Sequence, residues 1–127
     1  MPVAQTAFAR AIHGPEPLLA SGLPVILQSV PATARELGRA FLTTPYSSLP
    51  NYANAWLRHG FRDTDLTPKL SDALVDGIVA WGEPERAAVR VNEHLAAGAD
   101  HVCLHVVEPD RSRLPREGWR RLASALR

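Results

Sequence analysis

The chain has 127 residues, 46% of them hydrophobic and 21% charged, a composition that suits one globular domain with its own core and excludes a disordered segment. Its 14 Lys and Arg residues are nearly balanced by 13 Asp and Glu residues, so no basic stripe is present to bind nucleic acid. The single cysteine, Cys103, excludes an intrachain disulfide, and no apolar run is long enough to span a membrane. We expect a cytoplasmic protein without nucleic-acid or membrane partners.

The first two predicted elements are a helix and a strand. Apolar residues recur at helical spacing over residues 1–13, and Gly14 followed by Pro15 is typical of a helix end. After a loop rich in proline and glycine, the short β-favouring run at residues 25–28 predicts a buried strand.

Residues 32–82 form the longest predicted segment, and their pattern indicates several consecutive helices. Ser48 is placed to cap one of them, and Ser71 is placed to cap another. Gly60 and Gly82 each follow an apolar helical pattern, where glycine commonly ends a helix.

The last part of the chain predicts a helix, a strand and a final helix. A helix is expected over residues 84–97, because Pro84 suits the first turn and acidic residues suit the positive end of the helix dipole. Residues 101–107 are apolar on both faces, which favours a covered, parallel strand. A stripe of apolar residues predicts the closing helix at 115–126.

This order of elements predicts an α/β fold within a single domain spanning residues 1–127. It contains two parallel strands and about five to six helices, because strand–helix–strand connections join parallel strands.

Three potential metal ligands, His101, Cys103 and His105, alternate along the second predicted strand and therefore face the same side. Alternate residues lie about 6.6 Å apart, so neighbours can share a metal but the outer pair, about 13 Å apart, cannot. We expect these side chains to pack and form hydrogen bonds, and we predict no metal site.

Several short blocks of sequence identify a family resemblance. In order and spacing they resemble the C-terminal third of the luciferase-like (LLM class) flavin and deazaflavin oxidoreductases, and in detail the branch that depends on coenzyme F420. The blocks are Leu49-Pro50-Asn51-Tyr52, Gly60-Phe61, Leu74-Val75-Asp76, Trp81-Gly82 and Ala97-Gly98-Ala99-Asp100-His101-Val102.

The resemblance implies part of a TIM barrel. Residues 25–28 would be the seventh barrel strand, residues 101–107 the eighth, and residues 115–126 the closing helix. A complete barrel needs at least about 200 residues, so roughly the first six strands have no counterpart here. We therefore expect a C-terminal barrel fragment whose inner face is uncovered.

The implied activity is hydride transfer between F420 and a small organic substrate, which this chain would not catalyse alone because most of the active site is missing. The sequence leaves three alternatives open: a noncatalytic binding or assembly module, part of an FMN-dependent monooxygenase, and a small rearranged domain. The expected partners are a small-molecule substrate and either a second copy of this chain or a complementing N-terminal barrel portion.

Four residues are the candidates for substrate contact. Tyr46 and Asn51 belong to a region that lies near the pocket in the intact family. His105 and Glu108 would lie at the C-terminal end of the eighth strand, where TIM-barrel active sites are found. A solvated rim is the competing interpretation of His105 and Glu108. The motifs identify no catalytic residue and no cofactor-binding residue.

Overall fold

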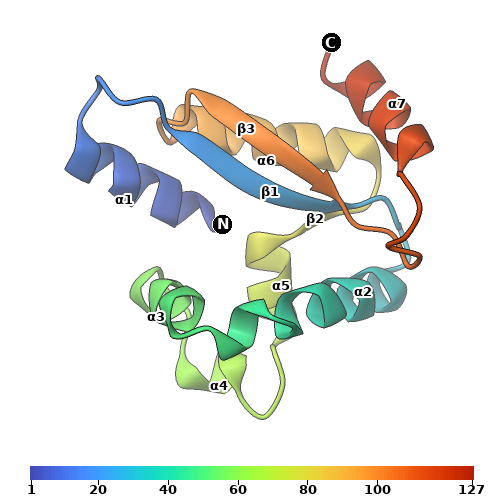
Figure 1. Ribbon diagram of the computed structural model, residues 1–127, viewed down its shortest axis with the longest axis horizontal. Helices are drawn as coiled ribbons and strands as arrows, with labels where there is room; N and C mark the ends of the chain where they lie inside the picture. Colours follow the sequence, from blue (N-terminus) through green and yellow to red (C-terminus); the bar gives the residue numbers. More distant parts are fainter.

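A computed structural model describes all 127 residues as an α/β fold built on a three-stranded parallel sheet. The strands are β1 (Ala20–Ile26), β2 (Ala80–Trp81) and β3 (His101–Val106), in the order β2-β1-β3 (Figure 1). The ladder between β1 and β3 runs from Ala20 opposite His101 to Val25 opposite Val106. The two predicted strands are therefore parallel neighbours.

Seven α-helices and one 3₁₀-helix surround this sheet. None of them is both long enough and apolar enough to cross a membrane. They are α1 (Val3–His13), α2 (Pro31–Thr43), the 3₁₀-helix η1 (Tyr46–Ser48), α3 (Pro50–Arg58), α4 (Asp63–Leu66), α5 (Asp72–Ile78), α6 (Pro84–Ala96) and α7 (Arg116–Ala125).

The predicted counts of two strands and about five to six helices were too low. The segment 32–82 is not helical throughout, because α5 ends at Ile78 and the chain then pairs with β1 as β2. The amide of Gly82 also donates to the carbonyl of Ile26 at 3.0 Å. The strand predicted at 25–28 begins earlier, at Ala20, because its first residues pair with β3.

The helix caps follow the predictions in part. Ser71 accepts a hydrogen bond from the amide of Leu74 at 3.1 Å and so caps α5 as expected. The prediction for Ser48 was wrong. Its hydroxyl donates instead to the carbonyl of Pro45 at 2.6 Å, and Leu49 occupies the cap position of α3 without a side-chain hydrogen bond.

The two faces of the sheet have different surroundings. Leu23 and Val25 of β1 and Val106 of β3 pack into a cluster with residues of α6 and α7. The opposite face carries Gly22, which is exposed, on β1 and the three alternating residues His101, Cys103 and His105, also exposed, on β3. One face is thus covered by helices and the other is open along β3.

The helices between β1 and β2 gather on one side of the sheet and form a second cluster (Figure 1). An ion pair connects them. Arg35 of α2 donates to Asp76 of α5 at 3.1 and 2.8 Å, and the indole of Trp81 donates to the same carboxylate at 2.7 Å. These bonds hold α2, α5 and β2 together, and the Arg35 guanidinium lowers the pKa of Asp76.

Helix α1 is joined to the turn that precedes β3. Arg10 donates to the carbonyl of Gly98 at 2.8 Å and forms an ion pair with Asp100. Asp100 also accepts a hydrogen bond from the amide of Leu19 at 2.8 Å. Gly98 has a φ of +106°, as expected for a turn at a helix end, so the Ala97–Asp100 motif has a structural role here.

Candidate functional site

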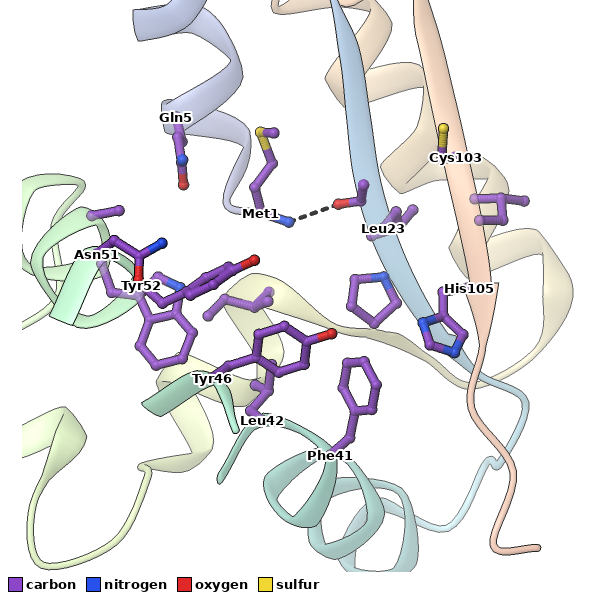
Figure 2. A pocket seen from close by; sticks show the side chains of 16 residues that line it. Met1, Gln5, Leu23, Phe41, Leu42, Tyr46, Asn51, Tyr52, Cys103 and His105 are labelled. Carbon is purple, nitrogen blue, oxygen red and sulfur yellow. Dashed lines mark hydrogen bonds between the residues drawn. The ribbon is translucent and has the colours of Figure 1, made fainter. Parts of the chain in front are cut away.

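A cavity of about 520 Å³ lies between the open face of the sheet and the helices α1, α2 and α3. Its walls come from segments far apart in the sequence. Gly22 and Pro24 of β1 and Cys103 and His105 of β3 form one wall, and side chains from the α2–α3 region form the wall opposite (Figure 2). The volume falls within the range of about 300–1,000 Å³ that is usual for small-molecule sites.

Aromatic side chains form a continuous series along the helical wall. The ring of Phe41 contacts His105 and Tyr46, with centroid distances of 5.2 and 5.3 Å. Tyr46 contacts Tyr52 edge to face at 5.0 Å, and Tyr52 contacts Trp56 at 6.4 Å. Edge-to-face contacts of this kind fix ring orientation, so the wall is shaped before any ligand arrives.

Local sequence explains how α3 contributes to this wall. Pro50 lies in the first turn of the helix, where its missing amide is not needed. Asn51 and Ala55 are four residues apart, as are Tyr52 and Trp56, so all four lie on one side of the helix and line the cavity.

Few polar groups face the cavity, and they are not paired with one another. Gln5, Tyr46, Asn51, Tyr52 and His105 carry its main polar side-chain atoms. Besides the backbone bonds of the helices and of the sheet, one hydrogen bond joins two lining residues, from the amino group of Met1 to the carbonyl of Gly22 at 2.7 Å (Figure 2). The other polar groups are free to bind a ligand, and no Asp, Glu, Lys or Arg side chain lines the cavity.

A second cavity of about 310 Å³ lies beyond the C-terminal end of β3 and is more polar. It is lined by Glu108 and by Arg111 and Arg113 of the following loop. His105 lines both cavities. The guanidinium of Arg111 also lies 5.3 Å from the centroid of Phe41, which connects the two sites through a cation–π contact.

The structure therefore brings three of the four predicted residues, Tyr46, Asn51 and His105, to one cavity. Glu108 lies outside it, in the second cavity, because the chain has left the sheet after Val106. Sequence reasoning missed the role of Phe41. Its place in the apolar stripe of α2 indicated only a core residue, and with 4% of its surface exposed it belongs to the core and also orients His105.

The alternating residues His101, Cys103 and His105 do share one face of β3, as predicted. No group of three His, Cys, Asp or Glu side chains in the chain is arranged to hold a metal ion. Cys103 is an exposed free thiol, and the imidazole of His105 is the one side chain of the cavity that carries both a possible proton donor and a possible acceptor nitrogen in a ring.

A separate cluster of reactive side-chain types lies sealed between α1, β1 and α6. The hydroxyl of Thr6 is 2.9 Å from that of Ser21 and 2.8 Å from Nδ1 of His94. All three residues have no exposed surface, and Nε2 of His94 has no hydrogen-bond partner. Burial, with smaller contributions from the positive charges of the N-terminus and Arg90, lowers the pKa of His94 to about 4. No substrate reaches this cluster, so it is structural.

Comparisons with known proteins found no relative. No family model matches the chain, and neither a curated protein nor a solved structure matches it.

Proposed function

We propose that this chain is the C-terminal, substrate-binding part of a luciferase-like oxidoreductase that uses F420 and transfers a hydride between that deazaflavin and a small organic substrate. One observation carries the proposal. Tyr46 and Asn51, which come from the motif region, meet His105 of the last strand in a single cavity. The resemblance of the sequence blocks to that family gives the reaction class.

The arrangement of the sheet supports a barrel origin. Adjacent strands β1 and β3 are parallel, and α6 and α7 pack on one face of them, as the outer helices of a barrel do. The helices between β1 and β2 cover the other face around Ile26 but leave it exposed along β3, where a complete barrel would have its inner side. Strand β2 has no counterpart in the assignment of β1 and β3 to the last two barrel strands, and it pairs with the other edge of β1.

The residues of this chain do not fit the whole cofactor. The 520 Å³ cavity has no cationic side chain to pair with an anionic cofactor tail, and the arginines of the second cavity share it with the acidic residues Glu108 and Asp110. The helix ends at Gly14 and Gly98 present carbonyl groups rather than amide donors. A complementing N-terminal barrel portion would supply the cofactor surface. The role of this chain is then to bind the substrate and exclude water from it.

Within the proposed site the polar side chains have distinct tasks. Tyr46 and Asn51 orient the substrate by hydrogen bonds from the helical wall, and His105 is the candidate general acid or base on the sheet wall. Phe41 positions His105 through an edge-to-face ring contact between the helical wall and the sheet wall. We also propose a cytoplasmic location, because Cys103 is an exposed free thiol that suits a reducing compartment.

The test is reconstitution with the first six strands of an F420-dependent luciferase-like enzyme, produced separately. Light scattering after gel filtration should show a complex of one copy of each chain, and the mixture should oxidise reduced F420 in the presence of substrate candidates. His105→Ala should leave the complex intact and lower the rate at least about tenfold. FMN is assayed in parallel, and turnover with FMN alone would assign the monooxygenase alternative.

The noncatalytic module is the second candidate, favoured by the fact that the chain has two buried apolar clusters of its own. It predicts a stable homo-oligomer that does not bind the N-terminal portion. A folded chain that forms no complex with that portion would overturn the oxidoreductase proposal.

A further inference from the structure

The residues that line the 520 Å³ cavity favour an uncharged ligand. Eleven of its 16 lining residues are hydrophobic, and none is Asp, Glu, Lys or Arg. The Met1 amino group also lines the cavity, where it donates to the carbonyl of Gly22, and burial lowers its pKa to about 6, so it is mainly uncharged at pH 7. A carboxylate or ammonium group that entered would therefore lose hydration without gaining the charged partner of a salt bridge, which is unfavourable.

The shape of the walls favours a flat ligand. The helical wall carries the rings of Tyr46 and Tyr52, set edge to face, and aromatic rings bind other rings in stacked or edge-on arrangements. On the sheet side, Gly22 has no side chain, and a Cβ built there meets no atom within 4 Å. The strand therefore leaves free space opposite the aromatic wall.

The polar atoms of the cavity limit the ligand further. The hydroxyls of Tyr46 and Tyr52, the Asn51 amide and the His105 imidazole line the cavity and are not hydrogen-bonded to one another (Figure 2). Hydroxyl, amide and imidazole groups complement an uncharged oxygen or nitrogen function such as a hydroxyl or a carbonyl.

From these three observations we infer that the cavity binds an uncharged, planar, mainly apolar ring compound that carries a hydroxyl or carbonyl group. The ligand class is inferred from the residues that line the cavity. Only the statement that this ligand is a substrate rests on the proposed function. Charged groups of a larger ligand would be directed to the second cavity, where Arg111 and Glu108 lie.

The test uses the chain by itself and two probes with the same ring system, 2-naphthol and 2-naphthoate. Backbone amide resonances are followed by NMR while each probe is added at pH 7. We expect 2-naphthol to shift the resonances of cavity residues and to bind at least about tenfold more tightly than the anionic 2-naphthoate. Equal or tighter binding of 2-naphthoate would overturn the inference.

A substitution that fills the cavity provides the second measurement. Gly22→Leu places a side chain in the free space between the walls, and we expect it to weaken 2-naphthol binding at least about tenfold. Ala20→Leu is the matched control, because Ala20 is an exposed residue on the same face of β1 but does not line the cavity. Unchanged binding by Gly22→Leu would also overturn the inference.

The set of amide resonances that 2-naphthol shifts in the unmodified chain tests where the ligand binds, even if Gly22→Leu does not fold. Shifts confined to other surfaces would contradict the inference. The binding test contains neither F420 nor the N-terminal portion, so its result is independent of the reconstitution test. A chain that binds 2-naphthol but fails reconstitution would support the inferred ligand class and contradict only the proposed oxidoreductase function.

Discussion

Phe41 and His105 contact each other edge to face at the junction of the two cavities, with ring centroids 5.2 Å apart and ring planes at 89°. Phe41 is buried and His105 is exposed, so the contact fixes an exposed imidazole against a rigid core residue. The position of His105 relative to a ligand is therefore set by α2 as well as by β3.

Replacing Phe41 with leucine should separate this positioning role from simple packing. We expect Phe41→Leu to lower the free energy of unfolding by about 1 kcal/mol, since volume is roughly kept but the aromatic contact is lost. The His105 imidazole should become more mobile, which NMR relaxation of the ring measures. Phe8→Leu is the control, because Phe8 makes a similar contact with His59 at 5.1 Å but is 42% exposed. An unchanged His105 would contradict the prediction.

The buried imidazole of His94 predicts a particular pH dependence of stability. Its pKa in the folded chain is about 4, below the ordinary 6.5, because burial disfavours the charged form. The unfolded chain therefore binds a proton first as the pH falls, and stability that is complete above pH 6.5 is lost progressively down to pH 4. The loss is about 3 kcal/mol at most.

Urea unfolding at pH 7 and pH 5 measures this effect, with His94→Gln as the comparison. The variant should be less stable at pH 7, yet its stability should change less between the two pH values. The Met1 amino group, whose pKa burial lowers to about 6, keeps part of the pH dependence in both chains. Acidic residues with lowered pKa values, such as Asp76 and Asp100, lose their contribution only at lower pH, below their ordinary value of 3.8. An equal pH dependence in both chains would show that His94 is not the group responsible.

The Asp76 carboxylate should be important for joining α2, α5 and β2. Asp76→Asn weakens the charge-assisted bonds from Arg35 and changes the acceptor for Trp81, so we expect a loss of about 1–2 kcal/mol, moderated because the carboxylate is partly exposed. Thermal and urea unfolding check this value. Glu117→Gln removes a surface ion pair with Arg120 at 3.6 Å and should change stability by less than about 0.5 kcal/mol.

Gly98 should be sensitive to substitution for two reasons. Its φ of +106° is unfavourable for other residues, and a Cβ there would lie 2.7 Å from the side chain of Arg10. Gly60 has the same φ, but a Cβ there meets no atom within 4 Å. Gly98→Ala should therefore destabilise the chain more than Gly60→Ala, by about 1 kcal/mol or more, in parallel urea titrations. Similar losses would mean that Arg10 moves aside without loss of its contacts.

Local patterns predicted most elements of the fold correctly. The helices now seen at Pro84–Ala96 and Arg116–Ala125 lie within one residue of their predicted ends, because their caps and apolar stripes are properties of neighbouring residues. Strand β2 could not be predicted in this way. Ala80 and Trp81 continue the apolar pattern of α5, and only pairing with Val25 and Ile26 makes them a strand.

Some features of the candidate site could likewise be predicted from the sequence, and others depend on tertiary contacts. The motif that contains Asn51 and the alternation of Cys103 with His105 are visible in the sequence, and both indicated residues worth testing. The sequence does not show that Phe41 would contact His105, that Gly22 would leave space opposite Tyr52, or that Glu108 would fall into a different cavity.

The sequence by itself determined the helical and strand periodicities, the turn glycines and the class of the fold, because these depend on residues within a few positions of one another. Tertiary structure alone decided the third strand, the open face of the sheet and the composition of the cavity. These features depend on contacts between residues that are far apart in the sequence, and no local pattern specifies which distant side chains will meet.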